Sequence, residues 1–288
     1  MTEDTSPALP SSKGSDLGRR LVVAFIGVPL ILALAFYAPN WALWAFYTVA
    51  AGVGAAEYAT MTMPTQRALR AWSVLCTMGL LSASYWLGPG AAIGGAAAAL
   101  IGVFLITMAT ADTFEPVAAR LGNSCAAVAY AALLFGGLIA LFQQPDAPQT
   151  TGGAQAGWFL FPMLVIWSGD TGAYFAGRRF GKRKLAPRLS PKKTWEGAIG
   201  GMLASVGGAF LARELFFPEM AAWACVVLAV PGAALGQVGD LAESLIKRST
   251  GVKDSGKILY GHGGVLDRMD AMLFAAPYFA CVKQLLSL

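Results

Sequence analysis

The chain has 288 residues, of which 56% are hydrophobic and only 13% are charged, with 21 basic and 16 acidic side chains. Soluble domains carry about 25% charged residues, so this chain lacks the charge to cover a surface that faces water. Disorder, a coiled coil, a collagen repeat and a disulfide scaffold are excluded by the same figures. The composition therefore predicts an integral membrane protein, and because its apolar segments have helical lengths, we expect it to be all-α.

Nine apolar segments are long enough, or nearly so, to cross a bilayer, because about 20 helical residues span a hydrocarbon core of about 30 Å. The second and third segments are short. The expected spans are residues 21–38, 41–56, 71–87, 91–109, 125–142, 157–176, 197–217, 221–239 and 265–287. The sequence thus predicts about nine transmembrane helices, preceded in the chain by a disordered cytoplasmic tail at residues 1–18. About five lie within an N-terminal region at residues 19–156, and about four lie within a C-terminal region at residues 157–288.

The Lys and Arg residues predict the orientation, because basic residues gather in cytoplasmic loops. With the N-terminus inside, all 21 of them except Arg213 and Lys283 lie on the cytoplasmic side. We therefore expect a protein of the inner membrane whose N-terminus is cytoplasmic and whose C-terminus lies on the outer side. Arg19 and Arg20 resemble the start of a signal peptide, but no polar region follows the first span, which favours an uncleaved helix.

Four cysteines and a single histidine limit the kinds of metal site and catalytic group that the chain can form. Cys76, Cys125, Cys225 and Cys281 lie in apolar runs without CxxC spacing, which favours reduced packing residues over disulfides or a zinc site. His262 is the only histidine, so histidine-based metal sites and histidine relays are excluded. Carboxylates, Lys and Arg must therefore supply the chemistry.

Small residues recur at helical spacing within two of the expected spans. They are Gly197, Gly201, Ala204 and Gly208 in one span, and Gly94, Ala98 and Gly102 in the other. Such faces let helix backbones approach closely, so they indicate tight packing within this chain or between two chains.

The first of two polar stretches runs from the sixth span into a basic loop. Asp170 lies near the end of that span, where a carboxylate costs energy unless it meets a cation, a metal or water. Residues 178–193 contain eight Lys and Arg, most of which we expect to attract anionic headgroups. The end of the loop, Ser190-Pro-Lys192-Lys193-Thr194, precedes a helix, where Thr194 is expected as the N-cap and free N–H groups favour phosphate binding.

The second polar stretch begins at Asp240. If it is helical, Asp240, Ser244 and Lys247 share one face, with Glu243 and Arg248 beside it. This run places two acids and two bases within three helical turns at the end of the eighth span.

A glycine-rich loop follows, and the ninth span then opens on acids. The loop carries Lys253, Asp254 and His262, and His262 could serve as a base or could contact phosphate. Asp267 and Asp270 flank Arg268 and lie three residues apart, on the same face of the expected helix.

Carboxylates beside Lys and Arg at a membrane surface suit Mg²⁺ together with a polyphosphate. Magnesium prefers carboxylate and phosphate oxygens and keeps several waters, while basic groups and backbone N–H donors neutralise phosphate charge. A favourable interaction with the helix dipole explains one acid in a first turn, but not three acids among four bases. The pattern therefore favours a site for magnesium and phosphate.

The second stretch resembles a known signature. It is similar to the signature of the CDP-diacylglycerol synthases, or phosphatidate cytidylyltransferases. The matching residues are Ser244-x-x-Lys247-Arg248-x4-Lys253-Asp254-Ser-Gly256, followed by His262-Gly-Gly-x-x-Asp267-Arg268-x-Asp270. The resemblance extends over residues 167–270, because two further elements also match: Asp170-Thr-x-Ala-Tyr174 and Ser190-Pro-Lys-Lys-Thr-x-Glu196-Gly. The first five spans match only in hydropathy. Tyr260 departs from the Pro or Gly usual in that family.

The resemblance implies transfer of a cytidylyl group from CTP to phosphatidic acid, which gives CDP-diacylglycerol and pyrophosphate. It also implies a Mg²⁺-dependent enzyme in the bilayer, with K⁺ as a second cation, a homodimeric assembly and no nucleic acid partner. Asp240, Asp267 and Asp270 become the implied metal ligands, and Lys247 and Arg248 join them as implied catalytic residues. The implied substrate-binding residues are Asp170, Ser190, Lys192, Lys193, Thr194, Ser244, Lys253, Asp254, His262 and Arg268.

The residue chemistry agrees with such a transfer, because a phosphate monoester has a second pKa of about 6 and is already anionic near neutral pH. No strong general base is then required. Two alternatives stay open: a CTP-dependent lipid kinase, which requires similar groups, and a secondary transporter for an organic anion. The transporter predicts broken helices in two repeated halves, whereas the polar residues here gather after residue 167.

Overall fold

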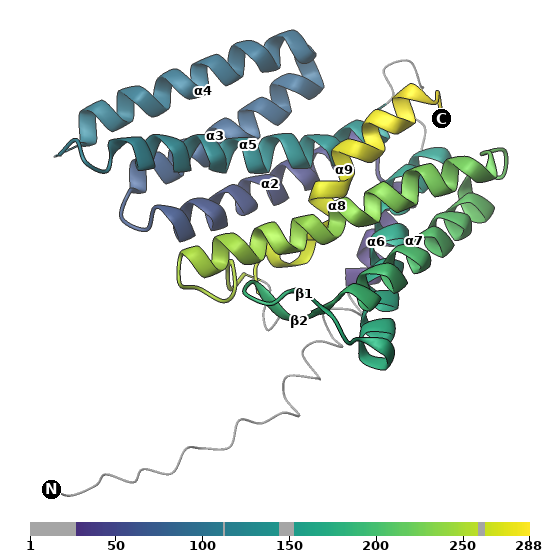
Figure 1. Ribbon diagram of the computed structural model, residues 1–288. Helices are drawn as coiled ribbons and strands as arrows, with labels where there is room; N and C mark the ends of the chain where they lie inside the picture. Colours follow the sequence, from purple (N-terminus) through teal and green to yellow (C-terminus); the bar gives the residue numbers. More distant parts are fainter. Residues whose placement is uncertain (1–26, 112, 144–152, 259–262) are drawn as a thin grey trace, which may run out of the picture.

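The computed structural model describes residues 27–111, 113–143, 153–258 and 263–288 (Figure 1). A first helix covers Gly27–Tyr37. The other elements are α2 (Asn40–Thr62), α3 (Arg67–Leu87), α4 (Pro89–Thr110), α5 (Val117–Phe142), α6 (Gly153–Phe180), β1 (Lys184–Ala186), β2 (Ser190–Thr194), α7 (Trp195–Phe216), α8 (Ala222–Ser249) and α9 (Leu266–Leu285). The described part of each expected apolar segment lies on one of these helices, which confirms the all-α prediction. The predicted tail at residues 1–18, Tyr260 and His262 lie outside the described residues.

Several helices differ in length from the expected spans. Within the described residues, α4, α5, α7 and α8 are each long and apolar enough to cross a membrane. α2 and α3 are longer than the short segments expected at 41–56 and 71–87. α8 continues to Ser249, well past residue 239, so the polar run from Asp240 to Arg248 is helical, which the sequence had left open. The nine-span arrangement, its orientation and the division at residue 156 stay predictions.

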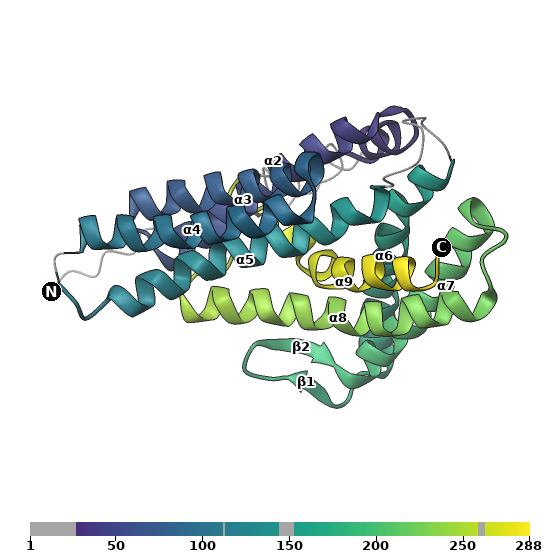
Figure 2. The same cartoon turned by 90° about the horizontal axis from the view of Figure 1, so that it is seen from above.

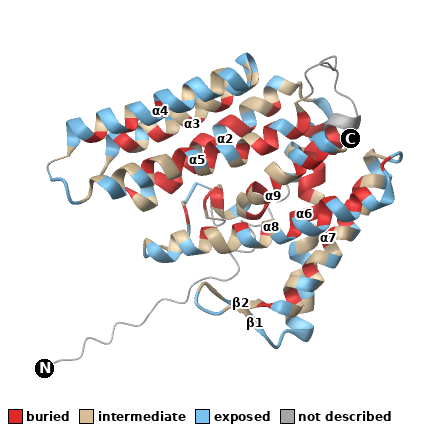
Figure 3. Ribbon diagram, turned by 45° about the horizontal axis from the view of Figure 1, so that its top comes forward, coloured by how far each residue is buried: buried red, intermediate tan, exposed pale blue. Residues whose placement is uncertain are grey.

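The helices form two groups that meet where α5 packs against α9 (Figures 1 and 2). α2, α3, α4 and α5 pack side by side in the first group, and in the second α6 packs on α7 and α8 on α9. At the junction, the ring centroids of Tyr47 of α2 and Phe159 of α6 lie 5.7 Å apart. Within the second group, Phe161 of α6 meets Phe279 of α9 edge-on, with ring centroids 5.5 Å apart. Figure 3 shows buried residues concentrated along α2, α5 and this junction.

The outward faces of several helices are apolar. On α4, Met108 is 75% exposed, and Leu203 on α7 is 70% exposed. Soluble proteins rarely expose large contiguous apolar patches, because such surface is costly in water. These faces are instead suited to contact lipid tails, and the chain is a helical membrane protein.

Small residues bring α6 and α7 into close contact. A Cβ atom on Gly201 would lie 2.9 Å from the carbonyl oxygen of Gly169, and one on Gly208 would lie 2.5 Å from that of Leu164. The predicted small-residue face on α7 is therefore used within the chain. The face on α4 is divided, since a Cβ on Gly102 would meet the indole of Trp72 whereas Gly94 faces open space. The homodimer stays a prediction.

A short antiparallel hairpin connects α6 to α7, where the sequence predicted only a basic loop. β1 and β2 pair Lys184 with Thr194 and Ala186 with Ser190. Pro187 lies in the turn and Ser190 precedes a proline, and both positions disfavour helix because proline lacks a backbone N–H and restricts the residue before it. Figure 2 shows the hairpin on the side of α8 that faces away from α3 and α4.

Substitution of the buried glycine on α7 should destabilise the protein. Gly208→Leu would drive a side chain into the backbone of α6, which typically costs about 1–3 kcal/mol. We expect the thermal unfolding midpoint in detergent to fall by roughly 2–10 °C. Gly207→Leu is the matched control, because no atom lies within 4 Å of a Cβ at Gly207. Equal midpoints for the two variants would contradict the packing.

Candidate active site

A cavity of about 420 Å³ lies between α6, α7, α8 and the hairpin. The polar side chains that line it come from α6, α8 and the hairpin, whereas α7 lines it with Gly197 and Ala198. These polar side chains are Asp170, Tyr174, Arg178, Lys192, Lys193, Thr194, Gln237 and Asp240. The cavity therefore gathers most of the first predicted polar stretch together with Asp240 of the second. Ser190 begins β2 but is not among the lining residues, and Tyr174, Arg178 and Gln237 were not among the predicted site residues.

The close approach of α8 and α9 places acids from both helices beside this cavity. A Cβ atom on Gly239 would collide with the carbonyl oxygen of Asp270, so only glycine permits this separation. As a result Asp240 and Asp270 lie within electrostatic range of each other, and Asp170 of α6 lies within range of both. Ala271, the residue after Asp270, lines the cavity.

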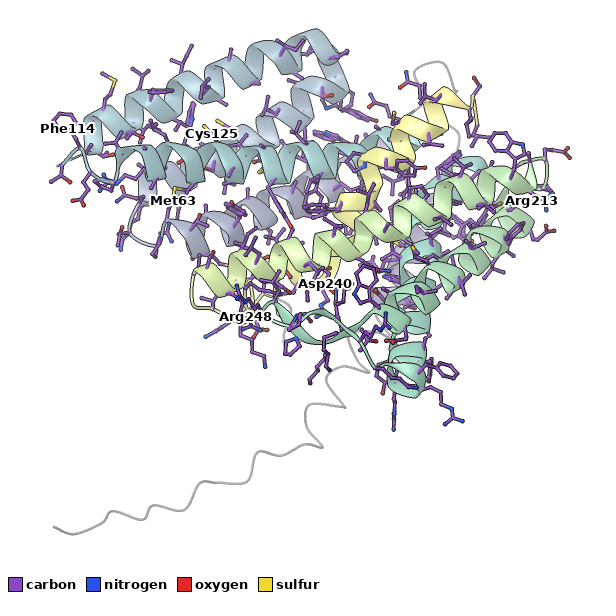
Figure 4. The ribbon with its side chains drawn as sticks, in the orientation of Figure 1. Met63, Phe114, Cys125, Arg213, Asp240 and Arg248 are labelled. Carbon is purple, nitrogen blue, oxygen red and sulfur yellow. The ribbon has the colours of Figure 1, made fainter. Side chains whose placement is uncertain are left out.

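Basic groups face these acids. Lys193 Nζ lies 2.6 Å from Asp240 Oδ2, in a pair that is still partly open to solvent. Arg268 is exposed on α9 and lies within electrostatic range of Asp170. Figure 4 shows Asp240 on α8, above the hairpin that carries Lys193. The cavity thus combines both signs of charge within reach of water.

The start of α7 adds backbone donors to the cavity. Thr194 has an extended conformation, and its Oγ1 accepts a hydrogen bond of 3.2 Å from the N–H of Gly197, which confirms the predicted N-cap. Both residues line the cavity, so the positive end of the helix dipole lies beside it.

Glu196 ties the base of the hairpin to α7. Its carboxylate accepts hydrogen bonds from the N–H groups of Lys182 and Arg183, at 3.0 and 3.2 Å. Glu196 precedes the seventh predicted span, and backbone N–H donors, its own first and then that of Lys182, lower the pKa of its carboxyl. The hairpin that carries Lys192 and Lys193 is therefore fixed at its base.

A second polar cluster lies where α8 ends and α9 begins. Lys247 Nζ lies 2.5 Å from Glu243 Oε2 and 2.7 Å from Asp267 Oδ1, and the side chains of Glu243 and Asp267 are only 2% and 6% exposed. Asp267 Oδ2 also accepts hydrogen bonds from the N–H groups of Ser255 and Gly264, at 2.9 and 2.8 Å. Asp267 is therefore held by one ammonium group and by the backbone before α9.

Gly263 explains part of the glycine-rich motif. It has a φ of 82°, which side chains rarely adopt. A Cβ atom there would lie 2.6 Å from Asp267 Oδ2. Glycine at this position therefore lets the chain turn tightly around the Asp267 carboxylate.

Glu57 of α2 belongs to this cluster, although it was not among the residues predicted from the sequence. The residue is 5% exposed, and its carboxylate accepts hydrogen bonds from the N–H groups of Val265 and Leu266, at 3.0 and 2.9 Å. A signal was present, because Glu57 is the only charged residue between Arg20 and Arg67. The argument applied to Asp170, that a carboxylate among apolar residues requires a partner, also applies to Glu57.

The remaining predicted residues lie on α8 or in the loop that follows it. Arg248, Lys253 and Asp254 are exposed, and Ser244 is partly buried on α8 between Asp240 and Arg248. None of these four lines the cavity. Their predicted roles toward substrate stay predictions.

The three predicted metal ligands are not gathered as one metal-binding group. Among the described residues, no three Asp, Glu, His or Cys side chains are placed to hold a metal ion by themselves. Asp240 and Asp270 lie near each other, whereas Asp267 is engaged by Lys247. Two carboxylates still fit Mg²⁺, which commonly takes one or two carboxylates and completes its coordination with waters and substrate phosphates.

The fold and the site define a helical membrane protein with a charged cavity bounded by α6, α7, α8 and a hairpin. The profile of the Cytidylyltransferase family matches residues 18–286. The chain therefore belongs to this family.

Several relatives named phosphatidate cytidylyltransferase are similar to parts of the chain. The protein from Brucella suis is 52% identical over 117 residues, which cover 41% of this chain and 43% of the relative. The protein from Haemophilus influenzae is 44% identical over 125 residues, covering 42% and 43%, and that from Pseudomonas aeruginosa is 43% identical over 150 residues, covering 51% of each. In these matches the chain spans about half the length of the relative or less.

Loss of the buried ammonium group should destabilise the second cluster. Lys247→Met leaves Glu243 and Asp267 without their cation, and breaking a buried ion pair typically costs about 3–5 kcal/mol. We expect a drop of that size in the free energy of unfolding, measured by denaturant titration in detergent.

Arg248→Met is the matched control, because Arg248 is the next residue on α8 and is exposed. Its free energy of unfolding should change by less than about 0.5 kcal/mol. A loss for Arg248→Met as large as that for Lys247→Met would contradict the assignment of the buried pair.

Proposed function

We propose that the protein is a phosphatidate cytidylyltransferase, an enzyme of phospholipid biosynthesis that transfers CMP from CTP to phosphatidic acid. The products are CDP-diacylglycerol and pyrophosphate. The observation that carries this proposal is the cavity, where Lys192, Lys193 and the capped start of α7 face Asp170 and Asp240. Membership of the Cytidylyltransferase family and the names of the relatives support it.

The basic side of the cavity suits the phosphates that both substrates carry. Ammonium groups and a guanidinium, from Lys192, Lys193 and Arg178, can form charge-assisted hydrogen bonds with phosphate oxygens. The backbone N–H groups at the start of α7 are further hydrogen-bond donors for phosphate oxygens. Lys193 is paired with Asp240, so a phosphate and a cation entering the cavity together can each take one member of that pair.

Asp240 and Asp270 are the residues that would hold Mg²⁺, with waters and phosphate oxygens as its other ligands. When bound, the ion would offset the negative charge of the triphosphate. Asp267, the third expected ligand, would serve mainly to hold Lys247 beside the two carboxylates. K⁺ as a second cation and a homodimeric assembly stay expectations from the resemblance.

The transfer requires positioning and charge neutralisation more than proton transfer. An anionic oxygen of phosphatidic acid attacks the α-phosphorus of CTP, the bond from that phosphorus to the bridging oxygen breaks, and pyrophosphate leaves with the electron pair. Repulsion between the two anions is the main barrier, and the basic residues of the cavity reduce it by binding the phosphates in place. The nucleophile is already ionised, so the chain has no need of a histidine base.

The distribution of charged and aromatic residues supports placing this cavity at the cytoplasmic surface of the inner membrane. Figure 4 shows Arg248, Met63 and Phe114 toward one end of the molecule and Arg213 at the opposite end. Near the hairpin, Phe175, Phe180 and Trp195 are exposed, as expected of aromatic residues at a membrane–water interface. We propose about nine spans, a cytoplasmic N-terminus and an outer C-terminus. Soluble CTP and a lipid headgroup could then meet without moving acyl chains into water.

The assay that tests the function follows the label of CTP. Purified protein in detergent with phosphatidic acid should transfer the α-phosphorus label of CTP into lipid, because CMP is the group transferred. A γ-phosphorus label should stay in pyrophosphate. Chelation of Mg²⁺ should reduce the rate to background, and added Mg²⁺ should restore it. Lipid labelled from the γ-position instead would identify a lipid kinase.

Removal of one carboxylate beside the cavity should stop the reaction. Asp270→Asn keeps the shape of the side chain but removes a charge that would hold the cation, so we expect a loss in kcat of at least about 100-fold. Yield and elution profile in detergent should stay unchanged. Lys184→Ala is the control, because Lys184 is exposed on β1 and is not among the cavity residues, and its rate should stay within about twofold. Near-normal activity of Asp270→Asn would exclude its role as a metal ligand.

A further inference from the structure

Glu57 makes a contact between the two groups of helices at the point where α9 begins. It lies on α2, yet its Oε1 accepts the N–H of Val265 and its Oε2 accepts the N–H of Leu266, 209 residues further along the chain. The Ser255 hydroxyl lies 3.1 Å from Oε2 as well. Both oxygens of this buried carboxylate are therefore engaged by groups that precede or begin α9.

These contacts supply what the local sequence of α9 lacks. The first N–H groups of a helix have no partner within the helix, and a polar side chain just before it usually accepts one of them. Val265 occupies that position in α9 and makes no side-chain hydrogen bond. Glu57 accepts two of these N–H groups and Asp267 accepts that of Gly264. Two negative charges at the positive end of the helix dipole stabilise this geometry.

Ser255 connects the two carboxylates. Its hydroxyl lies 3.1 Å from Glu57 Oε2 and 2.9 Å from Asp267 Oδ2. Because a hydroxyl has one proton, it can donate to only one of them at a time, while its backbone N–H donates to Asp267. A Cβ atom on Gly256 or Gly264 would collide with Glu57 Oε1, so both glycines leave space for this carboxylate.

The same turn sets the position of the acids of the site. Asp267 is in the first turn of α9 and holds Lys247, and Asp270 follows one turn later beside Asp240. A rotation or shift at the start of α9 would therefore move both carboxylates together. α2 itself contributes no side chain to the cavity among the described residues.

We propose that Glu57 is a positioning residue for the reaction: by capping α9 from α2, it fixes Asp267, Lys247 and Asp270 in their working arrangement. The inference rests on the proposed function of that site. Glu57 acts through the backbone of α9 and through Ser255, and it does not contact the substrates. Its loss should therefore lower kcat more than it changes the KM for CTP.

The test uses Glu57→Gln in the full-length protein. The amide keeps the size of the side chain, but its NH₂ group must face a backbone N–H, because both carboxylate oxygens accept one. We expect kcat to fall at least tenfold while the KM for CTP stays within about threefold. Hydrogen exchange of a peptide covering residues 263–270 should accelerate at least tenfold, with the peptides of α4 and α7 unchanged.

Thr48→Val is the matched control, because Thr48 is also buried on α2 and its hydroxyl has no hydrogen-bond partner in the described part of the chain. Both kcat and exchange should stay within twofold of the wild type. Ser255→Ala is a second variant, since it keeps the cap but removes the link between the carboxylates. It should lower kcat by an intermediate factor, and in the double variant with Glu57→Gln the two losses should combine to less than their product.

Three results would overturn the proposal. The first is a kcat of Glu57→Gln within twofold of the wild type, and the second is a double variant whose two losses in kcat multiply in full. The third is faster hydrogen exchange spread evenly over all helices, which is the pattern that a purely structural residue would cause. If the wild type transfers no label from CTP, the proposed function fails instead. The exchange measurement still decides whether Glu57 holds the start of α9.

Discussion

Two carboxylates, Glu57 and Asp267, hold the first turn of α9, and the arrangement of the site depends on that contact. They accept the N–H groups of Gly264, Val265 and Leu266, which would otherwise be without partners in a poorly hydrated environment. Asp267 then pairs with Lys247 at the end of α8. Because α8 and α9 are joined here and pack closely at Gly239, the acids of both helices come together at the cavity. The contact also joins the first group of helices to the second.

The mixture of acids and bases around the cavity follows from its setting in the membrane. A lone charge among lipid-facing helices is costly, so each buried acid is expected beside a cation, backbone donors or water. Lys247 meets two acids with little exposure, whereas the pair of Lys193 and Asp240 stays partly open to solvent. The first pair therefore holds the helices in place, and in the proposed reaction the second would exchange its partners for phosphate and a metal ion. This difference in burial separates a structural ion pair from one suited to binding.

Much of the fold could be predicted because hydropathy and helical hydrogen bonding are local properties. The described part of each of the nine apolar segments lies on a helix, and Thr194 caps α7 as its position before an apolar run indicated. The hairpin was missed because its basic residues hid the effect of Pro187 and Pro191 on the backbone. The expected span ended at residue 239, but α8 continues to Ser249, because residues beyond a span can stay helical wherever polar side chains reach water. The small-residue face of α7 was recognised, but the sequence could not tell that α6 would cover it.

The sequence by itself determined that the chain is a bundle of apolar helices and that its candidate site residues are mainly Asp, Lys and Arg after residue 167, because composition and motif spacing need no knowledge of packing. Only the tertiary structure decided which charges meet. It separated Asp267 from the pair formed by Asp240 and Asp270, added Tyr174, Arg178 and Gln237 to the cavity, and brought Glu57 to the start of α9. The physical reason is range: a helix forms through bonds between residues four apart, whereas a buried charge takes its partner from whichever helix packs beside it.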